Sequence, residues 1–245
     1  MTESAKSLRA SHTSDASGTS GTSDTSDTSG SSHLDAVRES FGTVADAYAE
    51  LVRPLLDASA EMREQLAAFA DEVREDGLGP IADLGCGPGH VTAFLAGCGV
   101  EAFGVDLSPR MIVLAAEAHP ELRFEVGSMT ELDLADASLG GVLAWYSTHL
   151  MPPELVSAAF LEMARTLAPG GRLLWGSYVG VDDSVRPEQA YGHPVTYELF
   201  MLTIERLVGL IEAAGFQVRD RRQEQLPGKQ RWHARVWAVK PAVAE

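Results

Sequence analysis

Apolar residues recur along this chain at two alternating spacings. Short apolar runs of the kind that form strands lie at 81–84, 102–105, 122–126, 142–146 and 172–178. Stretches with apolar residues at helical spacing lie between them, at 89–97, 109–118 and 153–167. Strands that alternate with helices predict a parallel sheet with both faces covered.

The segment before this alternation has a purely helical pattern. Residues 35–52 and 55–75 are expected to form two helices that are interrupted near Pro54, since proline lacks the N–H that a helix interior needs. Gly77 and Pro80 then end the helical region. We therefore expect a helical cap before the first strand.

The segment after the alternation predicts a different end to the sheet. A helix is expected over 203–214, with Gly215 as its stop signal. Two strands follow at 216–223 and 231–239, joined by a short connection that contains Pro and Gly, which favours an antiparallel pair. The whole pattern predicts an α/β fold with a doubly wound, mostly parallel seven-stranded sheet, an antiparallel C-terminal strand and an N-terminal helical cap.

Composition divides the chain at residue 33. Residues 1–33 are Ser, Thr, Gly and Asp in a near-repeat with little to bury, so we expect a disordered tail there and one domain over 34–245. That domain is expected to consist of a helical cap at 34–79, a core at 80–178, an insertion at 179–202, and a closing helix with two strands at 203–245.

Charge and cysteine content narrow the possible partners. The net charge is −16, and residues 1–33 contribute little of it because they hold four acids and two bases. Such acidity argues against a nucleic-acid partner, which needs a basic face. Cys86 and Cys98 form no metal-ligand pattern with the histidines, so we expect no metal and reduced thiols in a cytoplasmic protein. No apolar run reaches the roughly 20 residues that cross a bilayer, and we expect no membrane partner.

The stretch at 81–90, Ile-Ala-Asp-Leu-Gly-Cys-Gly-Pro-Gly-His, carries the most information. A buried strand leads into a helix through three glycines at alternate positions: Gly85, Gly87 and Gly89. Glycine permits a close approach of backbone to ligand, and the helix behind presents free N–H groups. A dinucleotide fingerprint has its third glycine where His90 stands, and Asp83 beside a pyrophosphate is unfavourable. A nucleoside with a positive charge therefore fits better than a dinucleotide.

A second acid follows at the end of the next strand. Asp106 lies 17 residues after Gly89, about where an acidic residue meets the ribose hydroxyls in folds of this kind. Its place relative to the glycine loop favours ribose binding over a solvated strand end.

These two segments resemble a known family. D-L-G-C-G-P-G-H followed by V-D-L-S-P-R-M resembles the first two motifs of class I S-adenosylmethionine-dependent methyltransferases. The likeness extends over 41–240, through L-A-P-G-G-R-L-L and A-A-G-F, and is greatest to small bacterial methyltransferases whose fourth strand ends in an A-W-Y-S-like run. The resemblance implies a Rossmann-like fold, S-adenosylmethionine as cofactor and methyl transfer as activity. It also implies that 80–178 is the cofactor-binding core and that the insertion at 179–202 covers the acceptor.

The resemblance also implies how the cofactor's methionine and ribose are held. The three glycines would cradle the methionine part, with Asp83 contacting its ammonium group. Trp145, which closes the fourth strand, would present a carbonyl to the same ammonium, and Asp106 would accept both ribose hydroxyls. Tyr48 from the helical cap would close over the cofactor, although it could equally be a packing residue.

Three further residues are implied at the adenine ring. Leu107 would pack on it, and Met129 would offer its backbone N–H. Ser128 stands where many relatives carry an acid for the adenine amino group. Together these residues would complete the cofactor site.

His149 is the candidate catalytic residue. It lies in the segment after the fourth strand, at the sheet edge where ligands bind in open α/β folds, and could take a proton from the acceptor. It could instead cap the turn at Pro152 and Pro153. His193, in the insertion, could contact the acceptor, whereas His233 is expected to be structural.

The acceptor is expected to be a small molecule. The chain lacks the Asn-Pro-Pro-aromatic run after the fourth strand that nucleic-acid amino methyltransferases use. Two alternatives from other classes stay open: a non-catalytic S-adenosylmethionine-binding protein and a nicotinamide-dependent oxidoreductase.

Overall fold

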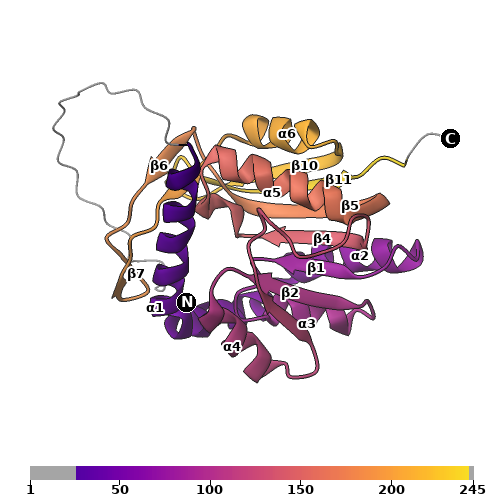
Figure 1. Ribbon diagram of the computed structural model, residues 1–245, viewed down its shortest axis with the longest axis horizontal. Helices are drawn as coiled ribbons and strands as arrows, with labels where there is room; N and C mark the ends of the chain where they lie inside the picture. The colour runs from indigo at the N-terminus through magenta and orange to yellow at the C-terminus, as the bar shows by residue number, and fades with distance from the viewer. Residues whose placement is uncertain (1–25, 243–245) are drawn as a thin grey trace.

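A seven-stranded sheet forms the centre of the protein (Figure 1). The structure is a computed structural model, and it describes residues 26–242. The strands lie in the order β10 (Gln217–Gln225), β11 (Trp232–Val239), β5 (Leu167–Val179), β4 (Leu139–Trp145), β1 (Ile81–Leu84), β2 (Ala102–Asp106) and β3 (Arg123–Val126). β11 runs antiparallel to both of its neighbours, and the other pairs are parallel. The predicted Rossmann-like α/β fold is confirmed.

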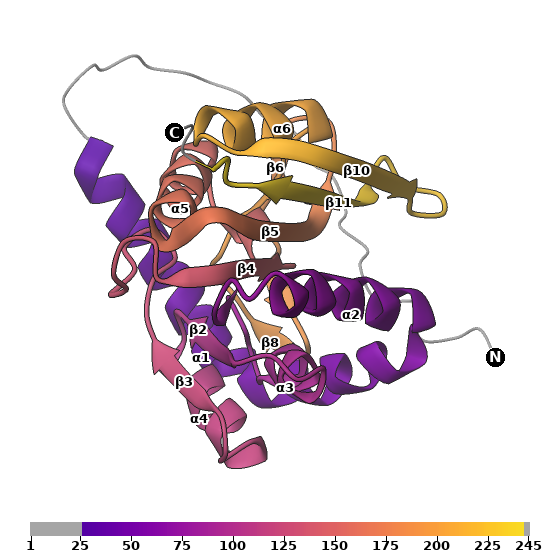
Figure 2. The same ribbon diagram turned by 90° about the vertical axis from the view of Figure 1, so that its right-hand side faces the viewer.

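Helices cover both faces of the sheet (Figure 2). One face packs against α5 (Pro153–Thr166) and α6 (Ile204–Ala213), and the other against α2 (Ala60–Glu75) and α3 (His90–Gly97). Another helix, α4 (Pro109–Ala118), lies beside β2 and β3. Alternation along β1 explains the two layers, because Ala82 and Leu84 face α5 and α6 while Ile81 faces α2 and α3.

The N-terminal helix is longer than predicted. α1 (Ser26–Ala58) starts before residue 33, so the expected boundary between tail and domain is wrong for residues 26–33. His33 explains part of this, because its Nε2 lies 2.7 Å from the Leu150 carbonyl oxygen and its ring meets the Phe200 ring edge-on. These contacts with distant segments anchor a stretch whose composition is a poor helix former. The predicted disorder of residues 1–25 lies outside the described residues.

The break between the first two helices also differs from the prediction. Pro54 lies inside α1, which continues to Ala58, and the chain turns at Ser59. Ser59 is the N-cap of α2, and its hydroxyl accepts the Met62 N–H at 3.2 Å. The cap residue therefore sets the break, and the proline one turn earlier does not.

The segment at 179–202 forms two small antiparallel sheets that the sequence did not reveal. β6 (Asp183–Val185) pairs with β9 (Leu199–Met201), and β7 (Gln189–Ala190) pairs with β8 (His193–Pro194). This segment packs on α1: the Ser40 hydroxyl accepts the Thr196 N–H at 3.0 Å, and the Phe41 and Tyr197 rings stack. The insertion and α1 thus form one layer beyond the carboxyl ends of the parallel strands.

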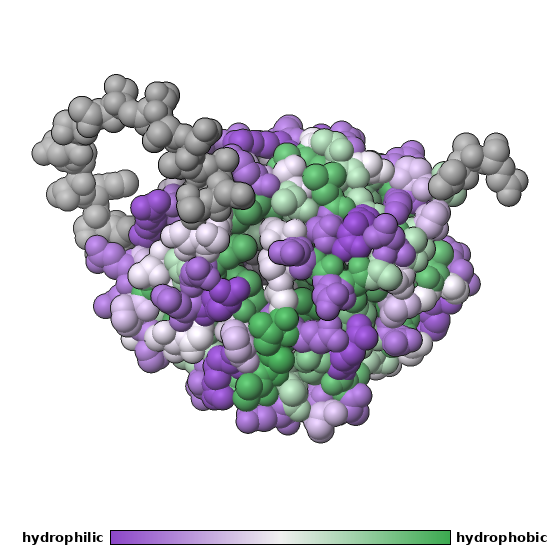
Figure 3. Space-filling model, in the orientation of Figure 1, coloured by the Kyte–Doolittle hydropathy of each residue, from purple (hydrophilic) through white to green (hydrophobic). Residues whose placement is uncertain are grey.

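The surface offers no broad apolar face in the view of Figure 3, where hydrophilic side chains surround small hydrophobic patches. Exposed apolar residues such as Val113 on α4 and Leu161 on α5 belong to different helices. Isolated apolar residues of this kind are normal on protein surfaces. Among residues 26–242, no helix is both long and apolar enough to span a membrane.

Candidate functional site

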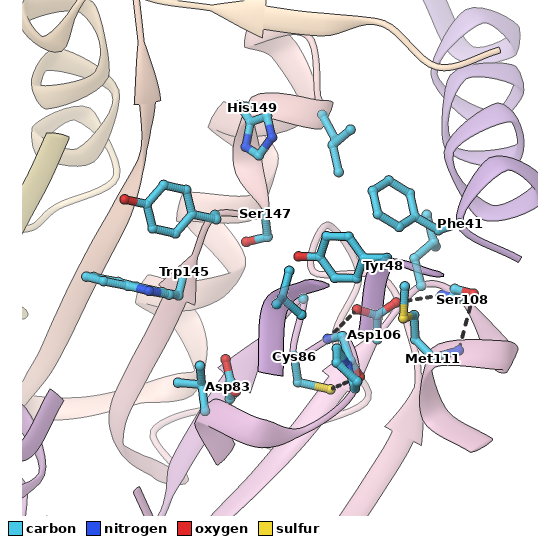
Figure 4. A pocket seen from close by; sticks show the side chains of 18 of the residues that line it. Phe41, Tyr48, Asp83, Cys86, Asp106, Ser108, Met111, Trp145, Ser147 and His149 are labelled. Carbon is cyan, nitrogen blue, oxygen red and sulfur yellow. Dashed lines mark hydrogen bonds between the residues drawn. The ribbon is translucent and has the colours of Figure 1, made fainter. Parts of the chain in front are cut away.

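A cavity of about 590 Å³ lies between the carboxyl edge of the sheet and α1 (Figure 4). Its floor consists of residues at the ends of β1, β2, β4 and β5, and residues of α1 from Leu34 to Ala58 line the opposite side. Cavities of roughly 300–1,000 Å³ hold small ligands and cofactors. The position agrees with the general rule that open α/β sheets bind ligands at this edge.

Most of the residues implied in cofactor binding meet in this cavity. The lining includes Tyr48, Asp83, Gly85, Gly87, Asp106, Leu107, Ser128, Met129 and Trp145. They come from five separate segments that only the fold brings together. Gly89 is the exception, because it does not line the cavity.

Gly89 instead allows close packing behind the loop. It has a left-handed conformation with φ 78° and is the N-cap residue of α3. A Cβ on Gly89 would lie 2.8 Å from Cζ of Phe124 and 2.9 Å from Cβ of Ala115. Its role is therefore to let α3 start close to β3 and α4, and not to contact the ligand.

Asp106 ties the glycine loop to the segment after β2. Its Oδ2 accepts the Gly87 N–H at 2.9 Å, and its Oδ1 accepts the Ser108 N–H at 2.8 Å. Burial raises the pKa of Asp106, and these two hydrogen bonds oppose the rise. The carboxylate is thus fixed at the cavity wall, with its remaining lone pairs available for a ligand.

Asp83 is the most deeply buried carboxyl group of the site, at 1% exposure. The Thr92 hydroxyl donates to its Oδ2 at 2.7 Å. Burial raises the pKa of Asp83 to about 7, with a smaller rise from nearby Asp106, while the Thr92 hydrogen bond lowers it. A positively charged ligand group beside Asp83 would favour its ionised form.

Tyr48 projects from α1 over the glycine loop (Figure 4). A Cβ on Gly87 would lie 3.6 Å from Cε1 of Tyr48, so the ring lies directly over this glycine. The Tyr48 ring also meets the rings of Phe41 and Tyr191 edge-on, at centroid distances of 5.6 and 5.2 Å. Burial raises the pKa of Tyr48, so its hydroxyl stays protonated. The side chain serves packing and cavity closure together.

Leu107, Ser128 and Met129 line the side of the cavity beyond Asp106. The Ser128 hydroxyl lies 2.7 Å from the Thr130 hydroxyl, which holds the turn after β3. A Cβ on Gly85 would lie 3.3 Å from Cε of Met129, so the Met129 side chain reaches back to the glycine loop. The segment after β3 therefore borders the cavity as the resemblance implied.

His149 lies across the cavity from Asp83 (Figure 4). It belongs to a short 3-10 helix, η1 (Thr148–Leu150), and its Nδ1 lies 2.9 Å from the Ser177 hydroxyl. Burial lowers the pKa of His149 to about 4, so the imidazole is neutral at neutral pH. A neutral imidazole can accept a proton.

Three aromatic or histidine residues of the site escaped the sequence reasoning. Tyr146 and Tyr178 line the cavity, and so does His233, which was expected to be structural. The Tyr146 hydroxyl lies 2.7 Å from Nδ1 of His233. His233 pairs in register with Tyr178 across β11 and β5, which no local pattern could reveal.

His90 and Trp145 border the cavity, whereas His193 lies outside it. His90 lines the cavity, and its buried Nδ1 has no hydrogen-bond partner among residues 26–242. Burial lowers the pKa of His90 to about 4. Trp145 packs on Gly176 and also leaves its buried Nε1 without a partner. His193 lies exposed in β8 and is not among the lining residues, so the structure does not bring it to the site. Residues 26–242 contain no group of three or more His, Cys, Asp or Glu that could hold a metal ion.

The donor set fits S-adenosylmethionine. Gly87 has φ 53° and leaves open the space under Tyr48 that a side chain would fill. The two carboxylates, Asp83 and Asp106, offer acceptors for an ammonium group and for hydroxyls. A pyrophosphate would instead meet two acids in a wall without a Lys or Arg side chain.

Comparison with known proteins agrees with this geometry. Residues 81–171 match the family described as a methyltransferase domain. An uncharacterised methyltransferase of Mycobacterium tuberculosis is 36% identical over 93 residues, which cover 38% of this chain and 37% of that protein. The demethylmenaquinone methyltransferase of Beutenbergia cavernae is 34% identical over 94 residues, 38% of each chain. The chain thus aligns with little more than a third of the length of these relatives.

A solved structure matches over most of the chain. It is the 1,6-didemethyltoxoflavin-N1-methyltransferase of Burkholderia thailandensis, with a TM-score of 0.65 and 19% identity, covering 86% of this chain and 90% of that one. At that identity the likeness concerns the fold. The family match gives no support to the nicotinamide-dependent alternative. Residues 81–171 thus match a methyltransferase domain, and the fold resembles that of a solved methyltransferase.

Proposed function

We propose that this protein transfers the methyl group of S-adenosylmethionine to a small-molecule acceptor, with His149 as the general base. One observation carries the proposal: a single cavity holds Asp83 and Asp106 at the ends of β1 and β2, and the neutral imidazole of His149 beyond the end of β4. One end of the cavity therefore suits a cationic nucleoside and the other suits a group that loses a proton.

Each residue at the cofactor end of the cavity contacts a particular part of S-adenosylmethionine. Asp106 accepts the ribose hydroxyls, and Asp83 faces the ammonium group together with the carbonyl of Trp145. Leu107, Ser128 and Met129 border the adenine, while the loop with Gly85 and Gly87 lies against the methionine part. When bound, S-adenosylmethionine supplies an activated methyl group on a sulfonium.

His149 acts on the acceptor at the other end. Its pKa of about 4 keeps the ring unprotonated, and the Ser177 hydroxyl at Nδ1 fixes the ring's orientation. The ring can then accept the proton that an acceptor hydroxyl or N–H loses on methylation. General bases of this kind contribute roughly 10²–10⁴-fold to a rate.

The layer formed by α1 and residues 179–202 covers the site. Tyr48 and Tyr191 meet edge-on above the glycine loop, and both line the cavity. Covering excludes water from the reacting groups, which is a main task of a protein whose donor is already activated. We assign the acceptor-covering role to this layer.

A small-molecule acceptor agrees with the cavity volume of about 590 Å³ and the net charge of −16. Two relatives are named for small molecules, demethylmenaquinone and 1,6-didemethyltoxoflavin. A nucleic acid would need a basic surface that this acidic chain is not expected to offer.

The test is a metabolite screen that follows conversion of S-adenosylmethionine to S-adenosylhomocysteine, followed by His149→Gln on the acceptor found. We expect turnover to fall by about 10²–10⁴-fold with cofactor affinity unchanged. His119→Gln, at the end of α4 and outside the cavity lining, is the matched control. Full activity of His149→Gln would remove the base from the proposal. Cofactor binding without turnover on any acceptor would favour a non-catalytic binding protein.

A further inference from the structure

The side of the cavity formed by the ends of β4 and β5 and the start of β11 is built from rings, and it begins at Trp145 beside the cofactor residues. Five of these rings gather where β4, β5 and β11 meet the same edge of the sheet, and we call them the ring cluster: Trp145, Tyr146, His149, Tyr178 and His233. β11 is antiparallel, so its start lies beside the end of β5, which brings His233 next to Tyr178.

Tyr178 is the centre of the ring cluster. Its ring centroid lies 5.1 Å from that of Tyr146, 5.3 Å from that of His149 and 5.0 Å from that of His233. Tyr146 also meets Trp145 edge-on at 5.5 Å. Rings in mutual contact form a rigid wall, and such walls favour flat, apolar partners that can stack or meet edge-on.

The backbone at Tyr146 reinforces this wall. Tyr146 has φ 54°, a conformation that non-glycine residues rarely adopt and that the surrounding structure must hold. The hydroxyl contact with Nδ1 of His233 at 2.7 Å and the contact of the Tyr146 N–H with the Gly176 carbonyl at 2.6 Å hold it. Strained residues of this kind cluster at ligand sites.

Charge is the second feature of the ring cluster. No Lys or Arg side chain is among the described residues that line the cavity, and the two lining carboxylates both lie at the cofactor end. Burial lowers the pKa of His149 to about 4 and lowers that of His233 as well. The charges of Glu224 and Arg235 act on Tyr146 and His233 with opposite signs, and neither residue lines the cavity. The Arg235 guanidinium also forms an ion pair with Glu61 at 2.8 Å.

An uncharged wall selects against charged ligands. A carboxylate, phosphate or ammonium group placed there would lose its hydration without gaining a partner of opposite charge, which costs several kcal/mol. Hydroxyls and neutral imidazole nitrogens can donate to or accept from an acceptor's O–H, N–H or C=O group.

We infer that the ring cluster is the acceptor subsite, and that it takes an uncharged planar ring with a hydroxyl or ring N–H in preference to carboxylates, phosphates and amines. The inference rests on the proposed methyl transfer, because it assigns the acceptor of that same site. It adds a chemical class that the family match does not supply.

The test measures binding and does not require turnover. Calorimetry on protein saturated with S-adenosylhomocysteine compares 2-naphthol with 2-naphthoate, 2-naphthyl phosphate and the non-planar decahydro-2-naphthol. We expect 2-naphthol to bind at least about tenfold more tightly than the other three, since an unpaired buried charge or a lost ring contact weakens binding.

Two variants locate that binding. His233→Arg places a cation in the ring cluster, and we expect the affinity ratio of 2-naphthoate to 2-naphthol to rise on the order of 10- to 100-fold. Its matched control is His119→Arg, outside the cavity lining, which should leave the ratio unchanged. Tyr178→Leu is a second, independent variant that keeps the test valid if His233→Arg fails to fold. It should abolish the preference for 2-naphthol over decahydro-2-naphthol without changing the affinity for S-adenosylhomocysteine.

The outcomes separate the two proposals. Failure to bind S-adenosylhomocysteine would overturn the proposed function and this inference with it. Binding of S-adenosylhomocysteine with no preference for 2-naphthol, or with no naphthyl probe bound, would overturn the inference alone. A preference that neither His233→Arg nor Tyr178→Leu changes would place the ring elsewhere and overturn it too.

Discussion

The hydroxyl of Thr92, in the first turn of α3, donates a 2.7 Å hydrogen bond to Oδ2 of Asp83 in β1. Both side chains are buried, with Thr92 at 0% and Asp83 at 1% exposure. The contact joins the strand and the helix on either side of the glycine loop. It also sets the charge state of the site, because it is the main influence that offsets the effect of burial on the pKa of Asp83.

Cofactor affinity should depend on pH through Asp83. Its pKa is about 7 in the ligand-free protein, and a ligand ammonium group favours the ionised form. Affinity for S-adenosylhomocysteine should therefore rise between about pH 6 and pH 8 as Asp83 loses its proton, and calorimetry in buffers of different ionisation enthalpy should detect proton release. Asp83→Asn should bind weakly and without this pH dependence, whereas Asp46→Asn on the surface of α1 should retain it. A flat profile in the unaltered protein would contradict the placement.

Thr92→Val should destabilise the protein more at pH 8 than at pH 5. The folded-state pKa of Asp83 is above its unfolded value of about 3.9, so its ionisation lowers the free energy of unfolding as pH rises from about 4 through 7. A hydrogen bond to the ionised carboxylate contributes about 1.5–3 kcal/mol, and to the neutral acid about 1 kcal/mol. Denaturant unfolding at both pH values measures the difference. Thr43→Val, whose hydroxyl bonds within exposed α1, is the control and should show none.

Asp106→Ala should lower affinity for S-adenosylmethionine by roughly 10- to 100-fold. The variant removes a charged acceptor for the ribose hydroxyls, and such hydrogen bonds contribute about 1.5–3 kcal/mol. It also removes the acceptor of the Gly87 and Ser108 N–H groups, so the melting temperature should fall too. Affinity per folded molecule, from calorimetry at a temperature where the variant is fully folded, separates the two effects. Unchanged affinity would mean that the ribose lies elsewhere.

Gly89→Ala should destabilise the protein without weakening cofactor binding per folded molecule. A Cβ there would meet Phe124 at 2.8 Å on a backbone with φ 78°, and strain of this kind costs about 1–3 kcal/mol. Gly97→Ala at the end of the same helix is the matched control, because nothing lies within 4 Å of its Cβ position. That variant should be neutral or more stable. A loss of cofactor affinity in folded Gly89→Ala would mean that this glycine contacts the cofactor after all.

The sequence was sufficient for the fold wherever local pattern and tertiary structure agree. It was insufficient where another segment decides the outcome. β4 begins at Leu139, three residues before the predicted start at Val142. The prediction missed these residues because Gly140 and Gly141 weaken the strand pattern. A Cβ on Gly140 would lie 2.5 Å from the backbone of Leu78, so this glycine is required by a chain segment some 60 positions away. The helical start of α1 was missed for a similar reason, since His33 is held by Leu150.

The candidate site likewise has one part that the sequence predicted and one part that it did not. The glycine loop and Asp106 lie within 25 residues of sequence, and their spacing together with the family resemblance pointed to residues that mostly line one cavity. The contact between Tyr146 and His233 joins positions 87 residues apart and depends on the register of β11 against β5. No periodicity in a single strand reports that register. The wall that Tyr146, Tyr178 and His233 form was consequently the part of the cavity that the sequence did not predict.

α1 contacts both the glycine loop and residues 179–202, which affects how ligands can be exchanged. The same helix carries Tyr48 over the glycine loop and holds residues 179–202 through the stacking of Phe41 on Tyr197. Tyr48 in turn touches Tyr191 in that segment. A displacement of α1 would therefore disturb residues 179–202 as well. If the proposed function holds, cofactor and acceptor would leave through the same opening, and a bound acceptor should lengthen the residence time of the nucleoside.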